Sequence, residues 1–272
     1  RRVGHAGTLD PMATGVLVVG IEKATRLLGH LALTEKQYAA TIRLGERTDS
    51  DDADGEITEA RPAGGVTDAA LRAAAAALTG EIQQVPPGIS AIKVGGQRAY
   101  RLTREGAPPD LPARTVTVSE LEITAIRRSD GPAGGRLDVD AEVTCSSGTY
   151  IRAIARDLGE ALGTGGHLTA LRRTRVGPYR ISGATPLDEL AAAAGPAELP
   201  VIPLAAAAAA AFESRQLTAL EARLIGHGGR LPALGHGPAP VAAFGPDGAL
   251  IALLTEADGQ ARSLAVFAAA DG

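Results

Sequence analysis

Alternation of apolar and polar residues predicts strands in both halves of the chain. Residues 37–44 (QYAATIRL) alternate, and residues 16–21 (VLVVGI) form a short β-branched run, so both are typical of strands, here flanking a short helix. Residues 115–126 and 136–145 also alternate, and the turn-rich sequence SDGPAGG lies between them. This arrangement predicts an antiparallel pair of strands.

Two further segments have the spacing of helices. Residues 149–162 (TYIRAIARDLGEAL) carry apolar or small side chains at helical intervals, and Gly163 lies just beyond their end. A second helix is expected to follow Thr67, a residue type that caps helix N-termini, and to stop at Gly80. The chain therefore mixes helices with strands.

The composition changes between residues 185 and 211, where runs of Ala and Pro mark a boundary. The tail from about Glu213 to Gly272 holds a short helix (LTALEARLI) and the strand-like stretches PVAAFG, ALIALLT and RSLAVFA. A β-rich module of about 60 residues is only marginally stable alone. We therefore expect it to dock on the larger part.

The size and composition of the chain limit its class. It has 272 residues, 45% hydrophobic and 21% charged, which is enough to bury one substantial core or somewhat more. The longest apolar runs are short and broken by Pro or Gly, so no membrane span is expected. The single cysteine, Cys145, cannot form an internal disulfide, which fits a reducing cytoplasm and predicts a small buried side chain.

Net charge limits how the chain can bind nucleic acid. The formal charge is −4, so any such binding must come from a local basic patch rather than from a uniform positive field. Arginines concentrate in residues 86–106 and 145–177. Of the few tyrosines that could stack on a base, Tyr100 and Tyr150 lie in these segments and Tyr38 lies in the predicted strand 37–44. The candidates for contacts with an RNA backbone are Lys93, Arg98, Arg101, Arg172 and Arg173.

The segment 46–59 (ERTDSDDADGEITE) holds seven acidic residues against one Arg. This composition predicts a solvated loop. A calcium-binding loop aligned on Gly55 would place Arg61 at its twelfth position, where a bidentate Glu is needed, so that class of site is excluded.

Residues 4–17 (GHAGTLDPMATGVL) contain the first group of reactive side chains. The Asp-Pro sequence disfavours helix at Asp10 and predicts a turn among small residues, which would expose the carboxylate to a ligand. An Asx turn that only organises the loop is the alternative interpretation. A phosphate-binding loop is excluded because the Gly-Lys-Ser/Thr ending is absent.

Arg152 stands at the start of the predicted helix, two residues after Tyr150. A buried guanidinium is costly unless a carboxylate receives it, and Asp10 is a candidate partner. The alternative is a surface Arg152 that contacts Asp157 or a phosphate, and these residues alone do not choose between the two.

Four blocks of the chain, in the same order, resemble the TruB family of bacterial tRNA pseudouridine synthases. The blocks are GHAGTLDPMATGVLVVG (4–20), KQYAATIRLGERTDSDDADGEI (36–57), QVPPGISAIKVGGQRAYRLTREG (84–106) and CSSGTYIRAIARDLGEALGTGGHLTALRRTRVGPY (145–179). The family normally carries a strand, a helix and a K-P-x-G-x-T-S element before the first block, so we expect the sequence to begin inside a longer protein.

The resemblance implies a fold and a domain organisation. The fold is the α+β pseudouridine synthase fold, with a mostly antiparallel mixed sheet flanked by helices. The catalytic domain is expected over residues 1–200, without its N-terminal strand and helix. A small β-rich, PUA-like RNA-binding module is expected over residues 213–272.

The same resemblance implies roles for individual residues. Asp10 would be the nucleophilic carboxylate, and Arg152 would hold it through a salt bridge. Tyr38 would stack on the flipped uridine, and a part in removing the C5 proton is also open to it. Contacts with the substrate are implied for His5, Tyr38, Tyr150 and Leu171.

The implied reaction isomerises the uridine at position 55 in the T-loop of tRNA. Because the base is detached at N1 and rejoined through C5 with no redox change, no cofactor and no metal are expected. Unstacking the base costs on the order of a few kcal/mol, which stacking on Tyr38 would offset. Attack of Asp10 at C1′, attack at C6 and elimination to a glycal all remain open.

Two other functions stay open at this point. A protein that remodels tRNA without modifying it also fits the basic and aromatic residues. A synthase that works through a guide RNA, as archaeal and eukaryotic relatives do, fits less well with the compact insertions and small C-terminal module. The expected partner is the T-loop and arm of tRNA, bound by a monomer in the cytoplasm, with no membrane and no metal.

Overall fold

The computed structural model forms two compact units. The first unit contains both ends of the chain: Arg1–Thr8, Leu17–Leu33 and Gly177–Gly272. The second unit contains Leu9–Val16 and Thr34–Val176. The structure describes residues 2–89, 93, 94, 97, 98, 111–131, 133–193 and 199–267.

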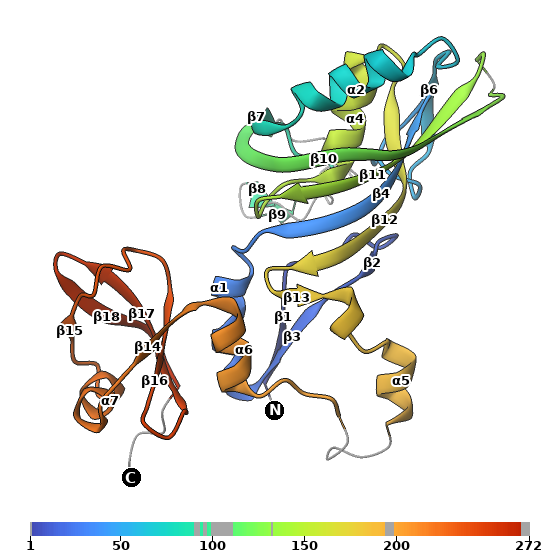
Figure 1. Cartoon of the computed structure of the whole chain (residues 1–272). Helices are drawn as coiled ribbons and strands as arrows, with labels where there is room; N and C mark the ends of the chain where they lie inside the picture. Colours follow the sequence, from blue (N-terminus) through green and yellow to red (C-terminus); the bar gives the residue numbers. More distant parts are fainter. Residues whose placement is uncertain are drawn as a thin grey trace. The chain divides into compact units, whose positions relative to one another are not determined.

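The second unit contains an antiparallel sheet in which the strands follow the order β12-β4-β11-β10-β7 (Figure 1). Strand β4 (Lys36–Leu44) pairs with β11 (Arg136–Cys145) on one side and with β12 (Gly166–Val176) on the other. Strand β10 (Arg114–Ser129) lies between β11 and β7 (Gly80–Gln84). The pairing of β10 with β11 confirms the antiparallel pair predicted from alternation.

Two helices pack against this sheet. Helix α4 (Ile151–Ala161) contacts β12 and β4, and α2 (Asp68–Ala77) contacts β10 and α4. Both confirm the helices predicted from spacing, and the Thr67 hydroxyl caps α2 by accepting a hydrogen bond from the Ala70 N–H at 3.2 Å. Strand β4 alternates strictly between buried and half-buried residues, so one face of it lies in the core between sheet and helices.

Helix α4 lies directly against the backbone at the start of β12. A Cβ atom added to Gly159 would lie 2.2 Å from the carbonyl carbon of Gly165, so only glycine allows this approach. The close contact fixes the position of the helix on the sheet. It thereby fixes Arg152 and Arg156, which lie one helical turn apart on α4.

The acidic segment 46–59 is only partly the solvated loop that its composition predicted: Asp49, Asp54, Glu56 and Glu59 are exposed, but Glu46, Asp51 and Asp52 are buried. Strand β5 (Glu46–Thr48) pairs with β6 (Ile57–Ala60), and Asp51 and Asp52 are only 6% and 3% exposed. Composition failed here because a carboxylate tolerates burial when a cation from elsewhere in the fold is paired with it.

In the first unit, β1 (Val3–Ala6) pairs with β3 (Val18–Ile21), which leads into a 3-10 helix (Glu22–Arg26) and α1 (Leu28–Leu31). The predicted β-rich tail is present as a sheet with the order β14-β16-β17-β18-β15. The remaining elements of the unit are β13 (Tyr179–Arg180), a 3-10 turn (Ile181–Gly183), α5 (Leu187–Ala192), α6 (Leu204–Ala211), β14 (Glu213–Gln216), α7 (Ala219–Gly226), β15 (Leu231–Pro232), β16 (Val241–Phe244), β17 (Leu250–Ala257) and β18 (Gln260–Val266).

Buried apolar contacts join the two ends of the chain, and the predicted domain ranges 1–200 and 213–272 stay predictions. Leu27 and Leu28 share one buried cluster with Phe244 and Phe267 of the tail, so the N-terminal strands fold together with the C-terminal module. A boundary read from composition follows chain order, whereas compact units follow side-chain contacts. Across the part of the chain that the structure describes, every helix is too short or too polar to cross a lipid bilayer.

Candidate active site

Asp10 lies in a tight turn that the Asp-Pro sequence predicted. The N–H of Ala13 donates to the Asp10 carbonyl at 2.9 Å, which closes the turn with Pro11 at its second position. Strand β2 (Thr14–Gly15) then pairs in parallel with β12. A Cβ atom at Gly15, where φ is +104°, would lie 2.1 Å from the Arg173 carbonyl oxygen, so only glycine lets the loop lie this close to the sheet.

The predicted ion pair between Asp10 and Arg152 is present. Arg152 donates from Nε to Asp10 Oδ2 at 3.1 Å and from Nη2 to Oδ1 at 2.8 Å, a bidentate pair. The Arg152 side chain is 5% exposed and that of Asp10 is 29% exposed. The cation is therefore buried while the carboxylate still reaches solvent, which rules out the surface Arg152 considered from the sequence.

Three more acceptors complete the surroundings of the Arg152 guanidinium. Nη1 donates to the Ser50 carbonyl at 2.8 Å and lies 3.4 Å from Asp52 Oδ2, and Nη2 donates to the Ile89 carbonyl at 3.0 Å. Nε and Nη2 thus donate all three of their N–H groups to Asp10 and Ile89, and Nη1 is shared between a hydrogen bond to Ser50 and the ion pair with Asp52. These contacts hold the Arg152 guanidinium in one orientation against the Asp10 carboxylate.

Arg156, one turn further along α4, forms a second pair with the acidic segment. Its Nη1 lies 3.4 Å from Asp51 Oδ2, its Nη2 donates to the Val85 carbonyl at 2.8 Å, and its Nε donates to Asp157 at 2.9 Å. Burial raises the pKa of Asp51 to about 6, and the nearby Arg156 opposes that rise. Asp51 has a φ of +60°, a left-handed backbone conformation that Asp and Asn adopt more readily than most residues.

Sequence reasoning missed Asp51 and Asp52 as members of this site. A signal was available: two arginines one helical turn apart on a predicted buried helix require carboxylates, and segment 46–59 had an excess of them. Composition alone placed that excess in solvent.

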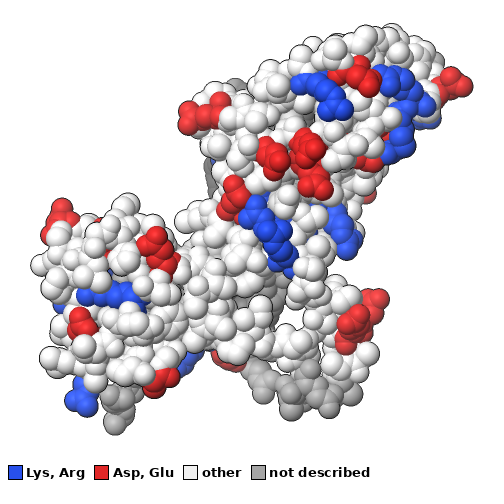
Figure 2. Space-filling view, in the orientation of Figure 1, with Lys and Arg blue, Asp and Glu red and all other residues white. Residues whose placement is uncertain are grey.

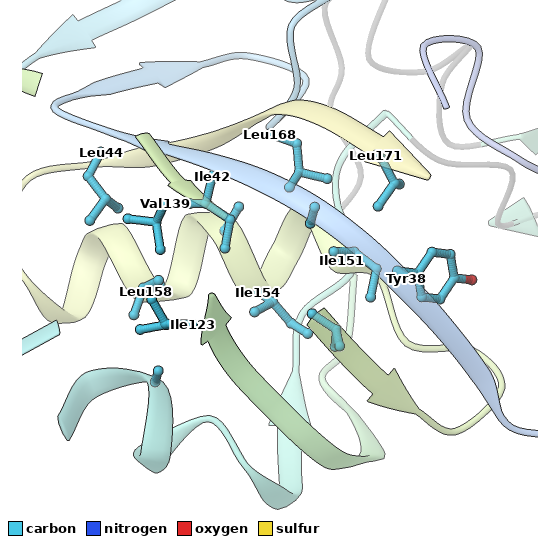
Figure 3. Close-up of a cluster of buried hydrophobic side chains, with 14 of the residues drawn as sticks. Tyr38, Ile42, Leu44, Ile123, Val139, Ile151, Ile154, Leu158, Leu168 and Leu171 are labelled. Atoms are coloured by element: carbon cyan, nitrogen blue, oxygen red, sulfur yellow. The ribbon is translucent and has the colours of Figure 1, made fainter. Parts of the chain in front are cut away.

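Tyr38 and Leu171 lie in the core on adjacent strands, with exposed fractions of 8% and 6%. In Figure 3 the Tyr38 ring stands at one end of the cluster with its hydroxyl directed away from the other labelled side chains. Burial raises the pKa of Tyr38 to about 12, against a hydrogen bond with Arg173 that lowers it. The hydroxyl is therefore protonated at neutral pH.

Tyr150 is half-buried at the residue before α4, two residues from Arg152. His5 is exposed on β1 and belongs to the first unit, whereas Asp10 belongs to the second. The substrate contacts of both residues stay predictions.

The predicted basic residues divide into different groups. Arg172 is exposed and donates to the Thr14 hydroxyl at 3.2 Å. Arg173 is 1% exposed and donates from Nε to the Val16 carbonyl at 2.8 Å. A guanidinium buried in this way is out of reach of an RNA phosphate, so the prediction of a backbone contact for Arg173 does not fit this structure.

The side chains of Lys93 and Arg98, on β8 (Lys93–Val94) and β9 (Gln97–Arg98), and the whole of Arg101 lie outside the described residues. On the face drawn in Figure 2, acidic and basic side chains of the described residues are interspersed. The buried thiol of Cys145 agrees with its prediction, and burial raises its pKa to about 11.

The chain matches the family model "TruB family pseudouridylate synthase (N terminal domain)" over residues 1–151. It also matches "tRNA pseudouridylate synthase B C-terminal domain" over 152–198 and "tRNA Pseudouridine synthase II, C terminal" over 212–268. It is 61% identical to tRNA pseudouridine synthase B of Thermobifida fusca and 56% identical to that of Streptomyces griseus, in each case over 98% of this chain, and over 89% and 88% of those proteins.

Two solved structures share the fold. One is an H/ACA RNP bound to a substrate RNA containing 2′-deoxyuridine, with a TM-score of 0.71, 25% identity, and coverage of 100% of this chain and 78% of that one. The other is a Cbf5-Nop10-Gar1 complex, with a TM-score of 0.68, 25% identity, and coverage of 99% and 76%.

The fold and the sequence matches together define a pseudouridine synthase, which is an isomerase. Within that class, the chain belongs to the TruB family. The α+β fold expected from the resemblance is confirmed.

Proposed function

We propose that this chain converts a uridine of tRNA to pseudouridine, with position 55 of the T-loop as the target and the Asp10 carboxylate as the reacting group. The bidentate Asp10–Arg152 pair carries the proposal, because it joins a carboxylate open to solvent to a buried cation. The names of the relatives, tRNA pseudouridine synthase B, support tRNA as the substrate.

The reaction balances without a cofactor. The C1′–N1 bond breaks, a C1′–C5 bond forms, the C5 proton is lost and N1 gains a proton, so that product and substrate are isomers. Attack of Asp10 at C1′, attack at C6 and elimination to a glycal each begin with an ionised carboxylate. Arg152 pairs its positive charge with that carboxylate and donates two hydrogen bonds to it.

Tyr38 and Leu171 are proposed to contact the extruded base. Because Tyr38 is 8% exposed, a uridine stacks on its ring only when neighbouring side chains move away from it. Its pKa of about 12 makes a resting phenolate scarce at neutral pH, which favours stacking over proton removal as its contribution.

The decisive experiment measures tritium release to water from tRNA containing [5-³H]uridine. Asp10→Asn is expected to abolish release while tRNA binding persists, because the amide keeps the side chain's size and loses its charge. Asp54→Asn is a matched control, since Asp54 is exposed in the acidic segment. Full activity of Asp10→Asn would show that another residue carries the chemistry.

The same assay tests the remaining details. A [5-³H]uridine-labelled tRNA with cytidine at position 55 should release no tritium, because its target uridine is absent. Dialysis of the protein against EDTA before the assay should leave the rate of release from wild-type tRNA unchanged. Release from tRNA with no other RNA present contradicts dependence on a guide. Binding without release would favour the alternative function of tRNA remodelling.

A further inference from the structure

Gln84, the last residue of β7, is 1% exposed, and its amide contacts the backbone of Tyr150 on both sides. The Tyr150 N–H donates to Gln84 Oε1 at 2.8 Å, and Gln84 Nε2 donates to the Tyr150 carbonyl at 3.1 Å. One side chain thus binds both backbone polar groups of Tyr150, a residue 66 positions away in the sequence.

Tyr150 stands at a position where the backbone needs such a partner. It is the N-cap residue of α4, with an extended backbone (φ −99°, ψ 112°), and its own side chain forms no capping hydrogen bond. Its carbonyl also receives the first helical hydrogen bond, from the Ile154 N–H at 3.2 Å. Gln84 therefore fixes the backbone of Tyr150, the residue from which the helix starts.

The residues after Gln84 also contact α4. The Val85 carbonyl accepts from Arg156 and the Ile89 carbonyl accepts from Arg152. Three residues between 84 and 89 are therefore hydrogen-bonded to the first half of α4, which carries the Asp10–Arg152 pair. A rotation of the Tyr150 backbone would move the Tyr150 side chain, and it would also displace Arg152, two residues further on.

We propose that Gln84 is a positioning residue for isomerisation, which acts through Tyr150 and Arg152 without contacting the reacting atoms. The inference rests on the proposed function, because Arg152 matters to the reaction only if Asp10 does. Small displacements of a reacting group lower rates strongly, while contacts with the rest of a tRNA are unaffected.

The test compares Gln84→Met with Gln83→Met by single-turnover tritium release from tRNA. Gln84→Met is expected to slow release about 10- to 100-fold with little change in the Kd for tRNA. Gln83 is the matched control, because it lies next to Gln84 on the same strand but is exposed, and its amide donates to the Thr115 hydroxyl at 2.8 Å. Gln83→Met should release tritium at the wild-type rate.

Gln84→Glu provides a second test that does not depend on losing the side chain. A protonated Glu can accept from the Tyr150 N–H and donate to its carbonyl as Gln does, whereas an ionised Glu can only accept. The rate of Gln84→Glu relative to wild type should therefore rise as the pH falls from about 8 to about 5.5. A loss of folded protein would instead lower the amount of tritium released in the single turnover and leave its rate constant unchanged.

The outcomes separate this inference from the proposed function. Wild-type release by a folded Gln84→Met, or a Gln84→Glu rate that equals wild type at every pH, would overturn the positioning role. If Asp10→Asn is inactive in the same series, the proposed function stands and only the inference about Gln84 fails. If Asp10→Asn is active, the proposed site fails first.

Discussion

Each compact unit contains a buried arginine paired with a carboxylate, and the two carboxylates differ in their exposure to solvent. Arg152 holds Asp10, whose side chain is 29% exposed, whereas Arg215 lies 3.8 Å from Glu256, whose side chain is 4% exposed. The oxygens of Glu256 accept three backbone N–H groups, from Leu234 at 2.9 Å and from Gly235 and His236 at 2.8 Å each.

The difference distinguishes Asp10, the carboxylate that we propose to react, from a carboxylate that holds the structure together. Glu256 is surrounded by protein donors that fix the loop from Leu234 to His236, so its oxygens are committed to the backbone. Asp10 is fixed by one guanidinium and keeps a path to solvent. Two similar ion pairs therefore differ in whether the carboxylate is accessible to a ligand, and the other groups that the carboxylate contacts decide this.

The largest effect is expected from Arg152→Met. Removing this cation leaves Asp52, with a side chain 5% exposed, without its ion-pair partner, and should cost about 3–5 kcal/mol of unfolding free energy as well as tritium release. Arg215→Met should cost less, because the backbone donors to Glu256 remain. Urea unfolding of both variants measures the difference, and equal losses would contradict the comparison.

Asp51→Asn should stabilise the protein near neutral pH. The pKa of Asp51 is raised to about 6, so the folded state holds its proton more tightly, and this group's contribution to stability is lost as the pH rises from about 4 through 6. Asn imitates the protonated form and tolerates the positive φ, so the gain should reach about 3 kcal/mol above pH 6.5 at most. Urea unfolding at several pH values should show the gain vanish near pH 4.

Glu256→Gln should have the smallest effect and the opposite pH dependence. Hydrogen bonds from the backbone, with Leu234 the main donor, hold the pKa of Glu256 below its usual value. The stabilisation that ionised Glu256 gives the folded state is therefore fully present when the pH is above that usual pKa, and it is lost as the pH falls below the lowered pKa. The variant should melt a few degrees lower at pH 7, by less in acid, and should release tritium at the wild-type rate. A slowed release would mean that the C-terminal module takes part in the chemistry.

The local pattern of the sequence determined the main elements of the second unit. The alternation of residues 37–44, the helical spacing of 149–162 and the turn at Asp10 depend on neighbours within a few residues, so they are legible in the chain itself. The need of Arg152 for a carboxylate was legible as well, and the resemblance to a family named Asp10 as that partner.

Only the tertiary structure decided which polar residues are buried. Segment 46–59 resembles a solvated loop and Arg173 resembles a surface residue, yet distant partners make their burial tolerable. Asp10 and Arg152 lie 142 residues apart, and Gln84 and Tyr150 lie 66 apart. A periodic pattern records which face of an element is apolar, but the burial of a charge or an amide depends on a partner that only the folded chain brings within hydrogen-bond distance.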